Sequence, residues 1–139
     1  MNLQRLTCLV LVTAILVGCS REYSGDRRFA LSGKVTLDGT PIDYGAISFI
    51  PAAGEQRVSG GTIVDGVYSV PEEEGANEGK YRVEIRWFKK TGKQFLDPET
   101  QTMMDRRDEG LPAKYHKDSI LTADVSADQA TFDFDLKSG

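Results

Sequence analysis

Histidine is nearly absent from this chain of 139 residues, and so is any excess of positive charge. His116 is the one histidine, so metal or acid–base sites built from several histidines are excluded. The 17 Lys and Arg residues are outnumbered by 21 Asp and Glu residues, which gives a net charge of −4. Nucleic-acid binding depends on clustered Lys and Arg, so this balance argues against such a partner. Helical periodicity is also missing beyond the first residues.

The first 18 residues have the three parts of a secretory signal. Arg5 supplies a positive start, residues 6–17 form an almost unbroken apolar run, and Gly18 is a small residue at the end of it. A membrane-spanning helix needs about 20 apolar residues to cross a core about 30 Å thick, so this run is too short. We therefore expect residues 1–18 to be a signal helix that is cleaved off, and removal of Arg5 changes the net charge to −5.

A short motif follows directly at the expected cleavage point. Leu16-Val17-Gly18-Cys19 resembles the lipobox of bacterial lipoproteins. The resemblance implies a diacylglycerol on the Cys19 thiol, cleavage just before it, and acylation of the new amine, for example by palmitate. A single short acyl chain binds membranes only marginally, whereas two or more give stable anchoring. Ser20 resembles the outer-membrane sorting class, so we expect anchoring in the cell envelope, at the outer membrane on its periplasmic or surface side.

Lipidation also decides the cysteine chemistry. Cys8 would leave with the signal, so the mature chain would have neither a free thiol nor a disulfide, and cysteine-bound zinc is excluded. Residues 19–28 are polar and without periodicity, and we interpret them as a lipidated tether. Residues 29–137 form the expected folded domain.

Within that domain the apolar residues recur with a period of two, which is typical of β-strands. About seven short strands are expected, and Gly, Pro and Asp turns separate most of them. They lie near residues 31–37, 46–49, 58–64, 67–70, 80–87, 121–125 and 132–136. Gly60-Gly61 suggests a bulge in the third of them. This spacing predicts an all-β fold, a two-sheet antiparallel sandwich. The expected core contains Val35, Phe49, Tyr81, Val83, Ile85, Phe132 and Phe134.

Four segments of the domain form a recognisable series: 33–42 (GKVTLDGTPI), 45–51 (GAISFIP), 65–68 (DGVY) and 79–83 (GKYRV). Together they resemble the carboxypeptidase regulatory-like domains, which are transthyretin-like (prealbumin-like) β-sandwiches. Segments 111–115 (LPAKY) and 132–136 (FDFDL) are similar to the short bacterial lipoprotein branch of this group. His116 departs from the pattern, because Asn is expected after the Lys-Tyr pair. The resemblance implies a sandwich outside the cytoplasm, and it implies no particular reaction.

Catalytic and metal sites find little support in the sequence. A hydrolase would have to combine His116 with Ser119 and Asp118, and no Gly-x-Ser-x-Gly elbow is present. We expect His116 to be a surface residue in a loop. The carboxylates between Asp97 and Glu109 have no calcium-loop spacing, and two arginines lie among them. We therefore expect no enzymatic activity, no metal site and no cofactor.

The segment 89–110 is the best candidate for a contact surface. It is expected to be a 22-residue connection between two strands, and loops beyond about 12–15 residues are usually functional or disordered. The candidate binding residues are Phe95, Met103, Met104, Lys114, Tyr115 and His116. We expect a membrane-anchored, non-catalytic module that contacts an envelope protein or a polysaccharide. Two alternatives stay open: a carrier for a small or carbohydrate ligand, with a pocket lined by Trp87 and Tyr115, and a hydrolase that uses His116.

The lipid anchor is directly testable. Protein extracted from membranes should lack residues 1–18 and carry added acyl mass on Cys19, because the lipobox-like motif follows a signal-like run. Intact-mass spectrometry measures both changes, and a Cys19→Ala variant should lose both. A water-soluble protein with an unmodified Cys19 would contradict the prediction.

Overall fold

The structure is a computed structural model that describes residues 27–139, with the exception of residue 55. The expected signal, residues 1–18, lies outside the described residues, and so does the lipidation site Cys19. Of the expected tether, only Arg27 and Arg28 are described. Arg28 already belongs to the first strand, so regular structure begins one residue before the expected start of the domain.

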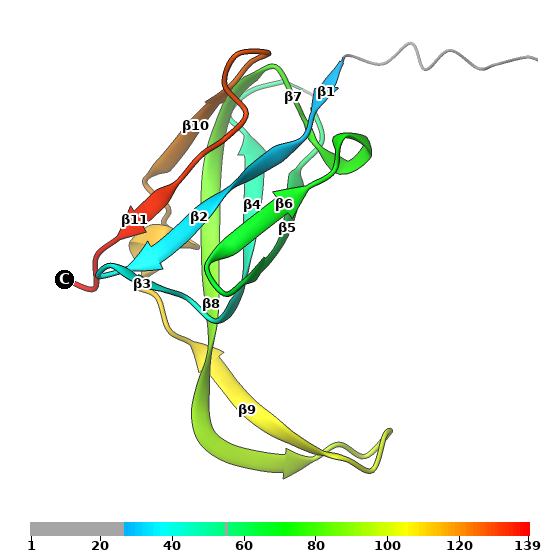
Figure 1. Ribbon diagram of the computed structural model, residues 1–139, viewed down its shortest axis with the longest axis vertical. Coiled ribbons are helices and arrows are strands. Elements are labelled where there is room, and N and C mark those ends of the chain that lie inside the picture. Colours follow the sequence, from blue (N-terminus) through cyan, green and yellow to red (C-terminus); the bar gives the residue numbers. More distant parts are fainter. Residues whose placement is uncertain (1–26, 55) are drawn as a thin grey trace, which may run out of the picture.

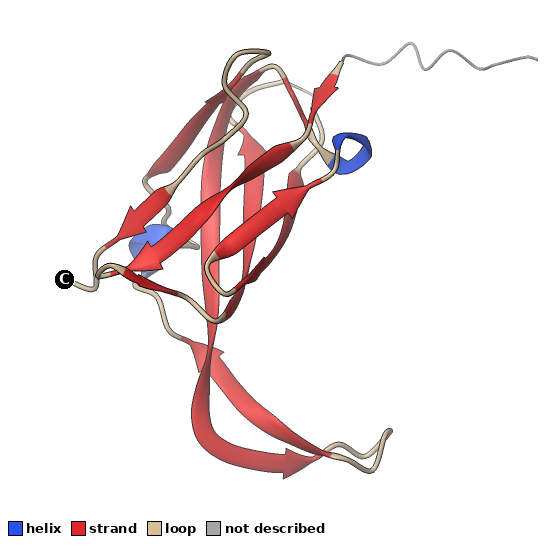
Figure 2. Ribbon diagram, viewed as in Figure 1, coloured by secondary structure: helices blue, strands red, loops and turns tan. Residues whose placement is uncertain are grey.

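The described residues form strands and short 3₁₀ turns, with no α-helix among them (Figure 2). The strands on the N-terminal side are β1 (Arg28–Phe29), β2 (Leu31–Leu37), β3 (Thr40–Pro41), β4 (Tyr44–Pro51), β5 (Ser59–Val64), β6 (Val67–Val70) and β7 (Ala76–Asn77). They are followed by β8 (Gly79–Leu96), β9 (Met103–Glu109), β10 (Leu121–Val125) and β11 (Phe134–Leu136), and the 3₁₀ turns are η1 (Glu72–Glu74) and η2 (Ala113–Tyr115). The all-β class is confirmed, and all seven expected strands are present.

The main strands are hydrogen-bonded in the order β10-β8-β4-β5-β6-β2-β11, with β3 beside β2 and β9 beside β8. The sheet turns back on itself between β5 and β6, so that β6, β2 and β11 lie over β10, β8, β4 and β5 (Figure 1). β1 and β7 form a separate antiparallel pair at one end. The result is a sandwich whose two layers enclose the core.

Two Asp-Gly turns explain how neighbouring strands reverse direction. Asp38-Gly39 connects β2 to β3, and Asp65-Gly66 connects β5 to β6. All four residues have positive φ, which is the conformation that two-residue hairpin turns require. Gly accepts positive φ without strain and Asp tolerates it better than most residues. Gly and Asp turns between the strands were expected from the sequence, and these two are of that kind.

The core lies between the layers and is built around Phe49. Its ring centroid lies 6.0 Å from that of Tyr68 and 6.1 Å from that of Phe132, both on the opposite layer, and 6.5 Å from that of Tyr81. The expected core residues Val35, Phe49, Tyr81, Val83 and Ile85 are all buried, whereas Phe132 and Phe134 are partly buried against them. The predicted strand faces are therefore right.

The direction of β11 differs from the expectation. β11 pairs with β2 in parallel, so the sandwich is not entirely antiparallel. After β10 the chain crosses to the other layer, where β11 runs beside β2 in the same direction. The alternation of residues 132–136 predicts a strand and its buried face, but it is identical for both directions.

The expected bulge at Gly60-Gly61 is also absent. β4 and β5 keep a regular register through both glycines. A Cβ at Gly60 would lie 2.3 Å from the carbonyl oxygen of Ile47, so glycine is required there by the close approach of the neighbouring strand.

Segment 89–110 is not the irregular loop expected from the sequence. β8 continues through Leu96, and β9 returns beside it over Met103–Glu109. Together they form a two-stranded ribbon, residues 88–109, that leaves the sandwich at the end opposite β1 (Figure 1). Charged and polar residues occupy both faces of the ribbon, so its apolar residues do not recur with a period of two. A search for the alternating pattern of half-buried strands therefore misses the ribbon.

The burial of Ile85 gives a stability prediction. Ile85→Ala should lower the free energy of unfolding by about 2–5 kcal/mol, because Ile85 is fully buried in β8. Ile120→Ala is the matched control, since that side chain is 71% exposed and its truncation should cost less than about 0.5 kcal/mol. Urea unfolding measures both, and equal losses would contradict the assignment.

Candidate functional site: the β8–β9 ribbon

The ribbon is a paired structure with one irregularity. Phe88 lies opposite Glu109 and Phe95 lies opposite Met104. Between Lys90 and Gln94 the register shifts, so that β8 has additional residues that β9 lacks. The Thr91 hydroxyl donates to the Arg106 carbonyl at 3.0 Å, and Gly92 has a φ of +78° within the irregularity. The Thr91 hydrogen bond and the positive φ that Gly92 can adopt therefore stabilise the bulge.

A closed turn forms the tip of the ribbon, over residues 97–102. One Asp97 carboxylate oxygen accepts hydrogen bonds from the backbone N–H groups of Glu99 at 2.8 Å and Thr100 at 3.3 Å. The Asp97 backbone N–H donates to the Thr102 carbonyl at 2.9 Å. An Asp that accepts from the backbone two residues on is a common turn-forming device, and Pro98 favours the same turn. The tip is thus polar and carries two carboxylates, Asp97 and Glu99.

Four large apolar side chains lie just behind the tip. Their exposed fractions are 47% for Phe95, 54% for Leu96, 58% for Met103 and 45% for Met104. Directly opposed residues share a face of a two-stranded ribbon, so Phe95 and Met104 lie on one face and Leu96 and Met103 lie on the other. The ribbon therefore carries apolar surface on both sides, and no part of the described sandwich buries it.

The root of the ribbon is held by Asp43, which precedes β4. One oxygen of Asp43 accepts a hydrogen bond from the indole Nε1–H of Trp87 at 2.6 Å, and the other lies 3.3 Å from the Arg107 guanidinium. Arg107 also donates to the Phe88 carbonyl at 2.6 Å and lies over the ring of Tyr44, 5.1 Å from its centroid. The Asp43 carboxylate thus connects the sandwich to Trp87 of β8 and to Arg107 of β9.

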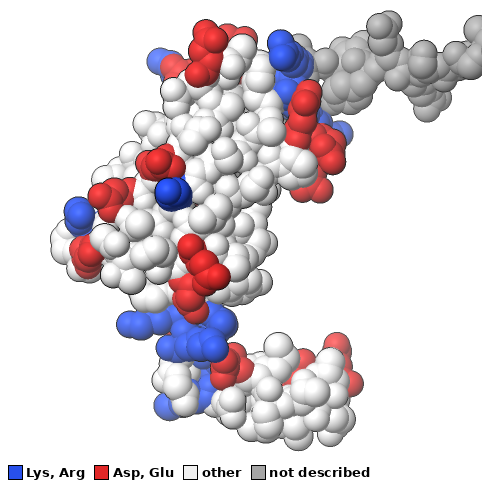
Figure 3. Space-filling view, viewed as in Figure 1, with Lys and Arg blue, Asp and Glu red and all other residues white. Residues whose placement is uncertain are grey.

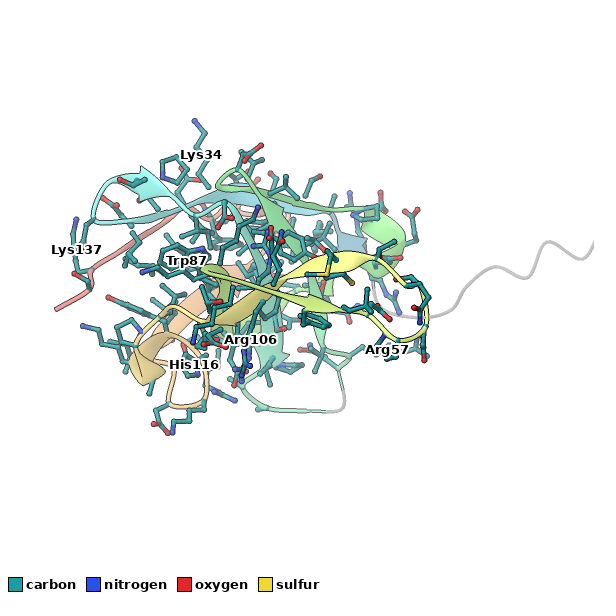
Figure 4. The ribbon with its side chains drawn as sticks, turned by 90° about the horizontal axis from the view of Figure 1, so that it is seen from below. Lys34, Arg57, Trp87, Arg106, His116 and Lys137 are labelled. Atoms are coloured by element: carbon teal, nitrogen blue, oxygen red, sulfur yellow. The ribbon has the colours of Figure 1, made fainter. Side chains whose placement is uncertain are left out.

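Glu109 and Gly110 hold the other side of the root. Glu109 accepts from the backbone N–H groups of Trp87 and Leu111, both at 3.0 Å, and it forms an ion pair with Arg86 at 3.4 Å. A Cβ at Gly110 would lie 2.5 Å from the Trp87 ring, so the chain passes directly against the indole. Figure 4, viewed from the ribbon end, shows Trp87 at this junction.

Positive side chains gather where the ribbon leaves the sandwich, as Figure 3 shows. Several of them are paired: Lys90 lies 2.8 Å from Asp105, and Arg106 lies 4.0 Å from Asp108. The hydrogen bond from Lys90, followed by one from Gln94, lowers the pKa of Asp105. These pairs are exposed, so each contributes little to stability.

The six predicted binding residues do not form one surface. Phe95, Met103 and Met104 lie together on the ribbon, as the sequence analysis proposed. Tyr115 and His116 are buried beneath the sandwich, with exposed fractions of 6% and 8%, so neither is available to a partner. Lys114 is partly exposed beside them, where it lies over the Tyr115 ring and donates to the Gly139 carbonyl at 3.0 Å.

His116 is not a surface residue, and that expectation is wrong. The histidine follows η2, which packs against β8, and its Nε2 lies 3.2 Å from the Leu111 carbonyl oxygen; Figure 4 labels its position. The Ser119 hydroxyl donates to the Val83 carbonyl and accepts from the Leu121 N–H, so it does not pair with His116. The Ser–His–Asp combination weighed from the sequence is therefore not assembled. Within residues 27–139, residue 55 aside, no group of three or more His, Cys, Asp or Glu residues is placed to hold a metal ion.

A shallow groove of about 700 Å³ runs along β8 and β10, at the end of β8 that is remote from the ribbon. Its lining is partly apolar, with Tyr81, Ile120, Leu121 and Phe132, and its charged residues are Lys80, Arg82 and Asp124. Trp87 and Tyr115, which a ligand pocket was expected to use, are not part of it. Their polar groups are engaged elsewhere, since the Tyr115 hydroxyl donates to the Lys137 carbonyl at 3.0 Å.

In comparisons with known proteins, no protein-family model, no curated protein and no solved structure matches the chain. None of the helices in the described part of the chain is long and apolar enough to cross a bilayer.

Asp43 is the residue that sequence reasoning missed, and Leu96, which lies within the expected segment 89–110, was not among the candidate binding residues. Asp43 stands between two apolar segments and forms no motif with Trp87 or Arg107, which lie 44 and 64 positions away. A usable signal existed for the ribbon itself. Thr91-Gly92 and Asp97-Pro98 are turn chemistry inside the segment, and Lys89 stands directly opposite Asp108 in the hairpin.

The ribbon root should respond to acid. The hydrogen bond from Trp87, opposed by partial burial and assisted by Arg107, lowers the pKa of Asp43, so its carboxylate stabilises the folded root above its unfolded pKa. That contribution is lost as the pH falls below about 4, through the lowered folded value. Trp87 is the one tryptophan, so its fluorescence reports the change. We expect an acid inflection that Asp43→Asn removes and Asp124→Asn leaves in place. An unchanged inflection in Asp43→Asn would show that Trp87 does not sense this carboxylate.

Proposed function

We propose that this chain is a lipid-anchored, non-catalytic β-sandwich module of the cell envelope, and that it holds or contacts another envelope component through the β8–β9 ribbon. The lipobox-like motif ending at Cys19 supports the anchor. The resemblance of segments such as 33–42 and 79–83 to carboxypeptidase regulatory-like domains supports a transthyretin-like sandwich outside the cytoplasm. An envelope protein or a polysaccharide is the partner class.

The observation that carries the proposal is the ribbon with its four exposed apolar residues. A two-stranded hairpin without a third strand is at best marginally stable in water. This one is held at its root by Asp43, Trp87 and Arg107, yet its four large apolar side chains all remain exposed. A rigidly held projection with exposed Phe, Leu and Met side chains fits a contact role, since aromatic residues and Met are enriched at protein interfaces.

The direction of the ribbon suits an anchored protein. The described chain begins beside β7, because Arg28 pairs with Asn77, and β8 starts two residues later. β8 has 18 residues, which would span about 55 Å if it were straight, and the ribbon tip lies at its far end. The described chain therefore enters the sandwich at Arg28, at the end opposite the ribbon (Figure 1). The contact residues then face away from the point of attachment.

The two alternatives receive less support. A carrier would need an internal pocket at Trp87 and Tyr115, and both side chains are engaged in structural contacts. A hydrolase would need His116 at an accessible site next to a nucleophile, and the Ser119 hydroxyl is bonded to β8 instead.

The contact role predicts a specific loss of partners. The full-length lipoprotein is crosslinked in whole cells, and its captured partners are compared with those of a variant that lacks residues 93–106. That deletion leaves Thr91-Gly92 as a short turn between the paired residues Lys90 and Arg107, so the root on Asp43 is kept. We expect the principal crosslinked species to disappear.

Two point variants make the test specific. Phe95→Ser with Met104→Ser should also reduce the crosslinks, because it removes the apolar surface of one ribbon face. Val64→Ser is the control, since Val64 is equally exposed on the sandwich. Unchanged partners in the deletion variant would overturn the contact role of the ribbon.

A further inference from the structure

The apolar surface of the ribbon is left uncovered by the rest of the described chain. Phe95 and Met104 are exposed on one face, and Leu96 and Met103 are exposed on the other. Both strand edges are open as well: in the described chain, β9 pairs with β8 alone, and β8 has no partner but β9 beyond Trp87. Unpaired edges with exposed apolar residues are templates for pairing with another chain.

The chemistry of the tip restricts what can cover this surface. The turn at residues 97–102 forms the tip of the ribbon, so Asp97 and Glu99 lie farther from the sandwich than the apolar side chains do. Insertion into a bilayer would bring these carboxylates into hydrocarbon first, which is unfavourable. The surface that fits is a protein groove with an apolar floor, positive charge for the tip, and a free strand edge beside it.

The groove along β8 and β10 has these three features. Its apolar lining includes Leu121 and Ile120, and Ile120 is the most exposed of the large hydrophobic residues described. Lys80 and Arg82 supply two positive charges against one lining carboxylate, Asp124. Arg82 also pairs with Glu84 at 2.7 Å and remains 42% exposed.

The free edge belongs to β10. β10 pairs with β8 over Leu121–Val125 and, within the described residues, has no second strand partner. Its other edge can therefore accept a strand of the ribbon, whose own edges are open. Edge-to-edge addition of this kind supplies backbone hydrogen bonds, while the side chains of the added strand supply specificity.

Within one molecule the ribbon cannot reach this groove. The groove is lined by Lys80, Tyr81 and Arg82 at the start of β8, and the apolar ribbon residues lie at its end. A continuous strand separates the two regions, by roughly 45 Å if it were straight. Contact therefore requires a second molecule.

We propose that the ribbon of one copy of this chain docks into the β8–β10 groove of the next copy, with Phe95 and its neighbours against Ile120 and Glu99 towards Lys80. The contact joins two different surfaces of the same protein. Such head-to-tail contacts form rings or filaments rather than closed twofold dimers. This inference rests on the proposed contact role of the ribbon and is independent of the anchor.

The experiment uses the full chain, co-expressed as two copies with different tags. A benzophenone amino acid replaces Phe95 in one copy, and light-induced adducts between the two tags are mapped by mass spectrometry. We expect adducts with residues 119–124 of the other copy, at a yield well above that from benzophenone at Val64, the exposed control position on β5.

A charge exchange tests the orientation. Lys80→Glu should lower the yield of the adduct by about three- to fivefold, because it opposes Glu99 on the tip. Adding Glu99→Lys in the other copy should restore it, whereas Glu99→Lys alone should lower it. Circular dichroism verifies that each variant is folded.

Three outcomes would overturn the proposal: adducts between two ribbons, adducts with a different protein alone, or an adduct yield equal to that of the Val64 control. An adduct with a different protein alone would still support the proposed contact role, so failure of self-docking and failure of the proposed function are distinguishable.

Discussion

One strand, β8, connects the interior of this protein to its most exposed surface. Its first half packs Tyr81, Val83 and Ile85 into the core and pairs with β4 and β10. Its second half leaves the sandwich and pairs with β9. Because the backbone continues without a break, the stability of the sandwich orients the ribbon. The groove at one end of β8 and the contact residues at the other are consequently held apart at a defined spacing.

The contacts of Asp43 stabilise the ribbon, which as a two-stranded hairpin would be only marginally stable by itself. Hydrogen bonds from an indole N–H and a guanidinium to a charged carboxylate are stronger than hydrogen bonds between neutral groups. The Asp43 carboxylate ties the start of β4 to β8 and β9 at the root of the ribbon. Gly110 contributes by letting the returning chain lie directly on the Trp87 ring. The ribbon therefore presents Phe95 and Met104 in a preorganised way, which lowers the entropy cost of binding.

The same packing commits the residues of the hydrolase alternative to structural contacts. Tyr115 and His116 follow Pro112 into the underside of the sandwich, where their side chains form structural contacts. Ser119 holds β10 to β8 through the Val83 carbonyl. A polar group that is committed to a buried structural hydrogen bond is costly to release, because the partner is left unsatisfied. These residues therefore support the fold, and the exposed chemistry of the molecule is concentrated in the ribbon and the β8–β10 groove.

The sequence by itself determined the strands of the sandwich, their buried faces and two of the turns. A half-buried strand must alternate, as residues 80–87 do, and Asp-Gly matches the positive φ of a tight hairpin, as at residues 65–66. Only the tertiary structure decided the parallel pairing of β11, the burial of His116, and the continuation of β8 as a ribbon with its root on Asp43. The physical reason is the same in each case. Alternation carries no direction, and burial of a polar residue depends on neighbours distant in the chain. A ribbon exposed on both faces leaves no apolar period to detect.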